Sequence, residues 1–228
     1  MLGGSVYLLL GRFHMLTVAD IEPHIESEFG SRLGPLGFQR LAERRWVRAQ
    51  KLPIRELFVI GALKGAQYSP SWGFSSGFVP SFRGGSFRRQ STDKNAVMDL
   101  VIDPIDITGD VPRQAFGFIK GHDAEIPIEQ IRASAEHFVP QALADFDRVS
   151  SIRDFCRFFV ERSRLEYRRF GFDMYVQHQL VRGFVLLLTG QRDEGLERIR
   201  EFCRSVHAEF EDRVLLECIR HAQSHTTP

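Results

Sequence analysis

Two hydrophobic periodicities divide the chain near residue 125. Before that point apolar side chains mostly alternate with polar ones, a period of two that is typical of β-strands. From Pro127 onward they recur every three to four residues, which is typical of helices. Strands that are segregated from helices in this way predict an α+β fold. We therefore expect a helix-plus-sheet unit over residues 15–125 and a helical unit over 126–228 that packs on it, with 1–14 as an extension or a misassigned start.

The first unit opens with a predicted helix from Thr17 to Leu33, which Thr17 and Asp20 cap at its start. Strands are then expected at Arg45 to Gln50, Ile54 to Leu63, Ala96 to Ile102 and 116–119. The second of these strands is apolar on both faces, which predicts a central position in an antiparallel sheet. Residues 74–82 also alternate, but Gly77 and Pro80 favour an edge strand or an irregular stretch there.

The second unit begins with an apolar stripe from Ile128 to Phe146, within which Pro140 predicts a kink or a break. Ser151 and Asp154 predict the capped start of the next helix. Two further helices are expected at 172–189 and 193–206, joined through Gly190. A last helix carries Val214, Leu215, Cys218, Ile219 and Ala222. Together these helices form the predicted C-terminal bundle.

The composition is that of an ordinary folded protein and singles out no class of partner. Hydrophobic residues make up 43% and charged residues 26% of the 228 positions. The net charge of +1 creates no global field that would attract nucleic acid or an anionic membrane. No apolar run approaches the roughly 18 residues of a membrane span. Three cysteines without a framework of pairs indicate a reducing compartment, so we expect a cytoplasmic protein without a membrane partner.

Motifs that would bind a cofactor are weak. The glycines at 73, 77, 84 and 85 form neither a dinucleotide fingerprint nor a Walker loop. The candidate metal ligands are Cys203, His207, Cys218, His221 and His225. Their spacing matches no structural zinc pattern closely, and both cysteines belong to apolar helical stripes, where a free cysteine acts as a small hydrophobe. We therefore expect no metal site and no other cofactor.

Catalytic motifs are weak as well. No Gly-x-Ser-x-Gly sequence is present, and Cys156 stands among phenylalanines. His122, Asp123 and Glu125 form a compact acid–histidine group in an expected loop, which could act as a general base or hold a metal. A hydrolase that uses this group is an alternative hypothesis, and a solvated loop is the simpler interpretation. We name no catalytic residue, and the balance favours a chain that is not an enzyme.

Residues 67–93 combine aromatic side chains and arginines among serines and glycines. Aromatic residues and arginine are enriched at protein-binding hot spots, and a glycine- and serine-rich backbone can present them. We predict that the partner-contact surface is formed or bordered by Trp72, Phe74, Phe78, Arg83, Arg88 and Arg89. The alternative is that the aromatic side chains fill the inner face of the sheet while the arginines lie in solvent.

The same stretch keeps a single-strand nucleic-acid binder as a further hypothesis, because stacking groups beside cations suit bases and phosphates. A second basic run adds to it: Arg40, Arg44, Arg45, Arg48, Lys51 and Arg55. The balance of acidic and basic residues over the whole chain speaks against this hypothesis. A protein partner is therefore the favoured expectation.

Three short motifs follow one another in the first unit: Leu36-Gly37-Phe38, Arg45-Trp46-Val47-Arg48 and Trp72-Gly73-Phe74. Their order is similar to that in a bacterial domain family of unknown function. Over about residues 15–110 the chain resembles this family, whose members look like a short helix, an LGF turn and an aromatic-rich sheet. Some such domains are suspected of an immunity role beside bacterial toxins. The resemblance implies a protein-binding module of immunity or adaptor type, which is our leading hypothesis.

Overall fold

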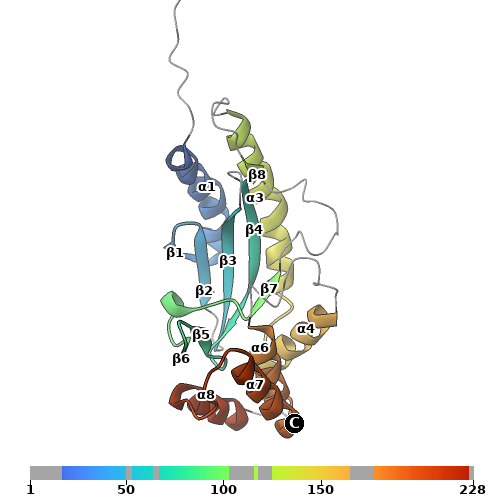
Figure 1. Cartoon of the computed structure of the whole chain (residues 1–228). Helices are drawn as coiled ribbons and strands as arrows, with labels where there is room; N and C mark the ends of the chain where they lie inside the picture. The colour runs from blue at the N-terminus through green and yellow to red at the C-terminus, as the bar shows by residue number, and fades with distance from the viewer. Residues whose placement is uncertain are drawn as a thin grey trace, which may run out of the picture.

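The computed structural model describes residues 17–49, 53–63, 67–102, 116–117, 125–164 and 177–225 (Figure 1). An N-terminal helix comes first, an antiparallel sheet follows, and helices make up the remainder. The predicted α+β class is confirmed. The first helix, α1 (Val18–Leu33), begins as its sequence predicts, because Thr17 and Asp20 cap it reciprocally.

The main sheet has the strand order β1-β2-β3-β4-β7, and each neighbouring pair is antiparallel. Its strands are β1 (Gln39–Ala42), β2 (Arg45–Ala49), β3 (Ile54–Leu63), β4 (Gln67–Ser76) and β7 (Leu100–Ile102), and β8 (Phe116–Gly117) pairs with the start of β4. The central position predicted for β3 is confirmed. The sequence pattern missed β1, and it overextended β7, which is preceded by the 3-10 turn η2 (Asp93–Asn95).

Strand β4 differs most from the prediction. It starts at Gln67 and ends before Gly77, so the strand lies earlier than the alternation over 74–82 suggested. Pro70 is tolerated inside it because β8 pairs with Gln67 and Tyr68 and β7 pairs with residues 72–74, which leaves Pro70 between the two partners. Gly73 is required by close approach: an added β-carbon would lie 1.9 Å from the carbonyl oxygen of Leu100. Neighbouring β7 therefore packs directly against the β4 backbone.

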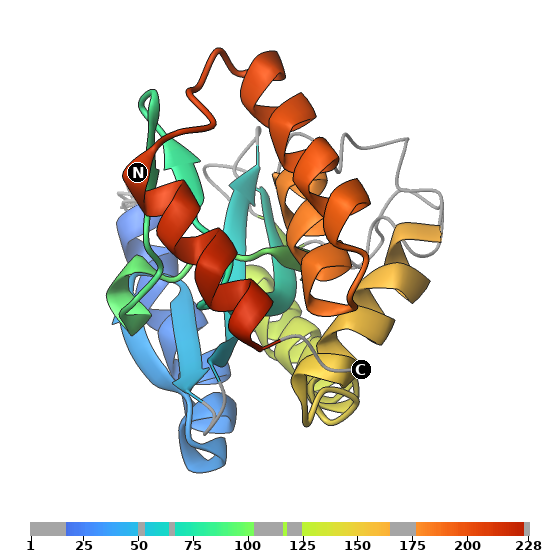
Figure 2. The same ribbon diagram turned by 90° about the horizontal axis from the view of Figure 1, so that it is seen from below.

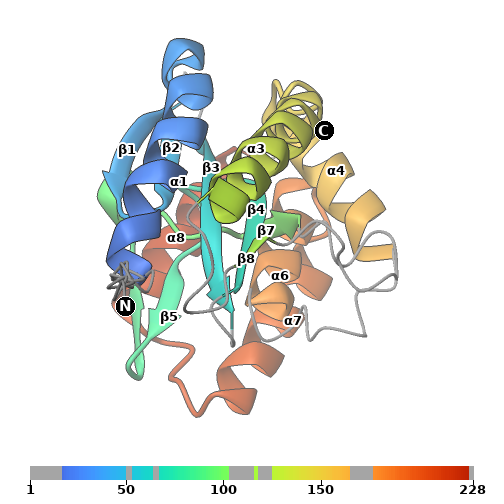
Figure 3. The ribbon, with the colours of Figure 1, turned by 90° about the horizontal axis from the view of Figure 1, so that it is seen from above.

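Helices α1 and α3 (Glu125–Phe146) cover one face of this sheet (Figure 3). Aromatic rings join the layers, with centroid separations of 5.5 Å between Phe29 of α1 and Phe58, and 6.2 Å between Trp72 and Phe138 of α3. Helix α3 is continuous through Pro140, so of the predicted kink or break the break is wrong, and the kink stays a prediction. Pro140 is exposed, so the proline lies on the solvent side of α3, where the helix can accommodate it.

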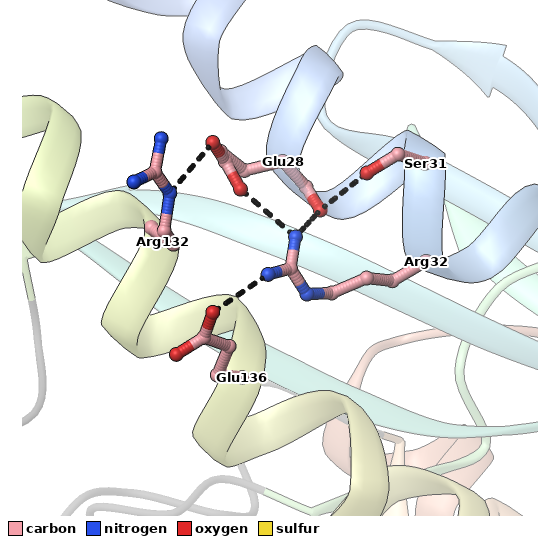
Figure 4. Close-up of polar contacts among 5 residues, drawn as sticks. All are labelled: Glu28, Ser31, Arg32, Arg132 and Glu136. Atoms are coloured by element: carbon pink, nitrogen blue, oxygen red, sulfur yellow. Dashed lines mark hydrogen bonds and ion pairs between the residues drawn. The ribbon is translucent and has the colours of Figure 1, made fainter.

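An ionic cluster links α1 to α3 on the outside of this helical layer (Figure 4). Glu28 accepts hydrogen bonds from Arg32 at 2.8 Å and from Arg132 at 3.2 Å, and Arg32 also donates to Glu136 at 3.0 Å. Burial alone would raise the pKa of Glu28, but these arginine contacts hold it below its ordinary value. Glu28 thus joins α1 to α3, while Glu22 and Glu26 pair with Arg44 and Arg40 of the β1–β2 region, so these glutamates are not simply a solvated face.

The remaining helices gather at one end of the sheet (Figures 1 and 2). They are α4 (Ile152–Arg164), α6 (His178–Leu188), α7 (Arg192–Ser205) and α8 (Arg213–Ser224). The predicted Ser151–Asp154 cap of α4 is present, with the Asp154 amide donating to Ser151 Oγ at 3.1 Å. Helix α7 begins at Arg192, one residue before the predicted start, and Asp193 lies in its first turn. Gly190 has a left-handed φ of 83° just after α6, as a helix end requires.

One hydrophobic cluster runs through both predicted units, from Ile25 of α1 through β4 to Leu215 of α8. Helix α3 belongs by sequence to the second unit but packs on the sheet of the first. The boundary at residue 125 stays a prediction, and this shared core is what would make the two units unfold together.

Candidate protein-contact surface

The aromatic half of the predicted surface lies in the core. Trp72, Phe74 and Phe78 are at most 1% exposed. The Phe74 ring contacts Phe146 of α3 and Phe158 of α4, and Phe78 stacks on His221 of α8 at 5.1 Å. Their surfaces are covered by the chain's own helices, so these three side chains do not form an exposed contact surface, and that they border one stays a prediction. The alternative interpretation, an aromatic inner face of the sheet, describes Trp72 and Phe74, while Phe78 lies in the turn after β4.

Trp72 is also anchored by its polar atom. Its Nε1–H donates to Asp145 Oδ2 at 3.0 Å, and the other oxygen of Asp145 accepts from Arg162 at 3.0 Å. The Arg162 side chain is only 11% exposed, so its charge is compensated inside the fold by Asp145. This arrangement fixes the indole in position between the sheet and α3.

A buried polar network holds the segment that follows β4. Gln90 donates to Asp99 Oδ1 at 3.0 Å and to the carbonyl of Val79 at 3.0 Å, and its amide oxygen accepts from Ser75 Oγ at 2.7 Å. Asp99 Oδ2 accepts from the backbone N–H of Ser76. Burial raises the pKa of Asp99 to about 8, although these hydrogen bonds oppose the shift. The sequence analysis did not single out this network, since its members are far apart in the chain.

The next segment forms a hairpin of β5 (Ser81–Arg83) and β6 (Ser86–Arg88), closed by Gly84 and Gly85 with φ of 58° and 77°. The predicted glycine turn is present. Phe82 pairs with Phe87, and both rings contact Phe202 of α7. Because side chains alternate along a strand, the other face of the hairpin carries the cross-strand pairs Ser81–Arg88 and Arg83–Ser86.

The arginine half of the predicted surface is at the outside of the molecule. Arg83 and Arg88 are exposed, and neither forms an ion pair or hydrogen bond through its side chain within the described ranges. Arg89 is 47% exposed and lies 3.9 Å from Glu217, a distance at which an exposed pair contributes little. We call Arg83, Arg88 and Arg89 the hairpin arginines.

The second basic run has a different role. Arg40 pairs with Glu26, Arg44 with Glu22, Arg48 with the fully buried Glu56, and Arg55 with Asp93. Lys51 lies outside the described residues. Arg45 is the exception: its side chain donates to the carbonyl of Ala96 and to no carboxylate in the described part of the chain. These ion pairs join α1 to β1 and the β1–β2 turn, β2 to β3, and β3 to the segment after β6.

The three cysteines considered for catalysis or metal binding are buried. Burial raises the pKa of Cys156 to about 12 and that of Cys218 to about 11, which removes thiolate reactivity near neutral pH. Among the described residues no group of three or more His, Cys, Asp and Glu side chains could hold a metal ion. His122 and Asp123 lie outside the described residues, and the side chain of Glu125 is not described either.

The sequence matches no protein-family model, no curated protein and no solved structure. The resemblance to a bacterial domain family stays a prediction, although Leu36-Gly37-Phe38 does form the turn after α1, and the other two motifs lie in β2 and β4. In the described part of the chain no helix is both long and apolar enough to cross a membrane. The candidate site therefore rests on the hairpin arginines themselves.

Proposed function

We propose that the chain is a protein-binding module of immunity or adaptor type, and that the hairpin arginines contact an acidic surface of its partner. One observation carries this proposal: Arg83 and Arg88 have no carboxylate partner in the described ranges, whereas four arginines of the neighbouring basic run each have one. Arginine presents a planar fork of donors that matches a carboxylate and is enriched at binding hot spots.

The hairpin is suited to presenting these side chains. Its phenylalanine face packs on α7, and the Gln177 side chain bonds to both backbone groups of Phe82, at 2.9 Å to the N–H and 2.6 Å to the carbonyl. These contacts fix the backbone, so a partner that binds Arg83 and Arg88 does not have to order the strand that carries them.

The burial of Trp72, Phe74 and Phe78 disfavours the nucleic-acid alternative. Proteins that bind single strands without sequence preference stack bases on accessible aromatic rings beside their cations. Here the rings lie inside the core, and most arginines of the second basic run are already ion-paired. An acidic protein surface needs only the exposed cations.

A charge-reversal comparison tests the proposal. The wild-type chain, an Arg83→Glu/Arg88→Glu variant and an Arg182→Glu/Arg192→Glu control would be used as affinity baits in extracts of the native cells. Arg182 and Arg192 are exposed on α6 and α7 and have no partner in the described ranges, so the control alters net charge equally. We expect a protein that is retained by the wild type and the control and lost from the hairpin variant.

Equal retention by the hairpin variant would contradict the proposal. Loss of all retained material after nuclease treatment would instead favour the nucleic-acid alternative. Circular dichroism of the hairpin variant checks that its fold is intact, which is expected because both arginines are exposed.

A further inference from the structure

Helix α8 presents its arginines and its one glutamate on an outward stripe next to the hairpin (Figures 1 and 2). The stripe consists of four residues that recur every three to four positions: Arg213, Glu217, Arg220 and Ser224. The apolar side chains of the helix face inward instead. The helix packs against β6, and His221 stacks on Phe78, which precedes the hairpin. The stripe therefore lies beside the end of β6 and not on a distant part of the surface.

The glutamate of this stripe is surrounded by cations from two elements. Nε of Arg213 donates to Glu217 Oε1 at 2.9 Å, and a terminal nitrogen of Arg89, just after β6, lies 3.9 Å from Glu217 Oε2. Arg220 follows Glu217 by three residues, which places both on the same side of the helix. The Arg213 hydrogen bond lowers the pKa of Glu217, and the charges of Arg89 and Arg220 lower it further. One carboxylate thus faces an excess of positive charge.

These three guanidinium groups keep most of their donors available. An arginine fork can donate two parallel hydrogen bonds to a carboxylate. Arg213 uses one nitrogen in this way, while Arg220 donates only to the carbonyl of Leu216 at 3.4 Å and forms no ion pair in the described ranges. The Arg213 side chain is 90% exposed, and that of Arg89 is about half exposed. All three can therefore bind an acceptor from outside without a change in the backbone.

We propose that Arg89, Arg213 and Arg220 form a docking surface for an acidic segment of a partner protein, and that Glu217 is an internal competitor for it. Charge complementarity supports this occupant: the group that already pairs with Arg89 and Arg213 is a carboxylate, so their spacing suits an aspartate or glutamate side chain. A partner carboxylate can replace Glu217 because exposed ion pairs are weak. The docking surface rests on the proposed function and extends it from the hairpin onto α8.

The experiment measures the affinity of the purified full chain for fluorescently labelled poly-L-glutamate at low ionic strength, by fluorescence anisotropy. Arg89→Gln with Arg220→Gln should weaken binding about fivefold or more, because two of the three cations are lost. Arg182→Gln with Arg192→Gln removes the same charge from exposed positions of α6 and α7 and should change the affinity by less than about twofold. Circular dichroism checks that each variant is folded.

The competitor role of Glu217 has its own variant. Glu217→Gln should tighten the binding of poly-L-glutamate about two- to fivefold, because Arg89 and Arg213 lose their internal acceptor. Glu194→Gln is the matched control, since it removes one negative charge from an exposed position of α7. If Glu217→Gln binds no more tightly than Glu194→Gln, the competitor role is overturned.

The docking surface is overturned if the Arg89→Gln/Arg220→Gln variant binds poly-L-glutamate as the wild type does. Tighter binding to single-stranded oligothymidine, lost in the same variant, would overturn the choice of a protein partner. Arg83→Gln with Arg88→Gln separates the two proposals. If only this variant loses poly-L-glutamate, the hairpin contact stands and the α8 surface fails, and if only the Arg89→Gln/Arg220→Gln variant loses it, the α8 surface stands without Arg83 and Arg88.

Discussion

Strand β4 and the β5–β6 hairpin are consecutive parts of one glycine-, serine- and aromatic-rich stretch, yet β4 lies in the core and the hairpin lies partly at the surface. In β4 the side chains of Trp72 and Phe74 are covered on one side by α3 and α4, and β3 and β7 pair on either edge. In the hairpin only one face is covered, by Phe202 of α7, and Arg83 and Arg88 stand on the other. The same composition therefore serves as core in one place and as surface in the next.

The difference teaches that aromatic side chains in this stretch pack in the core. The side chains left at the surface to contact a partner are arginines without an ion pair. Phe78 illustrates the transition, since it lies between the two segments and stacks on His221 of α8. Because aromatic rings bury large apolar areas, any helix that can reach them will cover them. A guanidinium remains at the surface unless a carboxylate is placed beside it.

The sharpest way to break this comparison is to remove the central ring of β4. Trp72→Ala should lower the free energy of unfolding by about 3–5 kcal/mol, because it empties an aromatic core site and leaves Asp145 without the indole donor. Trp72→Phe keeps a ring and loses only the N–H, so its cost should be clearly smaller. Urea unfolding measures both. A loss below about 1 kcal/mol for Trp72→Ala would refute its role in the core.

A smaller effect is expected at the network that joins β4 to the segment after the hairpin. The folded-state pKa of Asp99 is raised to about 8 from its ordinary value of 3.8, so between these values the folded chain binds more protons than the unfolded chain. The contribution of Asp99 to stability is therefore fully present below about pH 4 and is lost as the pH rises through 8.

Asp99→Asn should flatten this dependence. It should also cost about 1–3 kcal/mol at low pH, because one amide end would face the donor of Gln90. Denaturant unfolding at intervals from pH 4 to pH 8 measures the slope of both proteins. Identical slopes for the wild type and the variant would show that Asp99 does not titrate in this range.

The smallest effect on stability is expected at the hairpin. Arg83→Gln with Arg88→Gln should change the free energy of unfolding by no more than about 0.5 kcal/mol, since both side chains are exposed and unpaired in the described ranges. Arg48→Gln is the contrasting control, because it leaves the buried Glu56 without its arginine and should destabilise the chain strongly. If the hairpin variant lost as much free energy of unfolding as Arg48→Gln, Arg83 and Arg88 would have to stabilise the fold instead of serving as exposed contact residues.

The sequence by itself determined the fold class, the capped start of α1, the central place of β3 and the glycine turn of the hairpin. Each of these depends on local chemistry: a side chain that caps a backbone three residues away, an apolar period, or a left-handed φ at Gly84 and Gly85. Such signals are complete within a few residues of the chain.

Only the tertiary structure decided which members of the 67–93 stretch are core and which are surface. Phe74 becomes buried because α3 and α4, more than fifty residues away, close over it, and Arg48 becomes structural because Glu56 lies directly across β2 and β3. Arg45 stays without a carboxylate in the described residues for the same kind of reason, since its cross-strand neighbour in β3 is Val59. Burial and charge compensation are properties of neighbours in space, which the order of residues does not state.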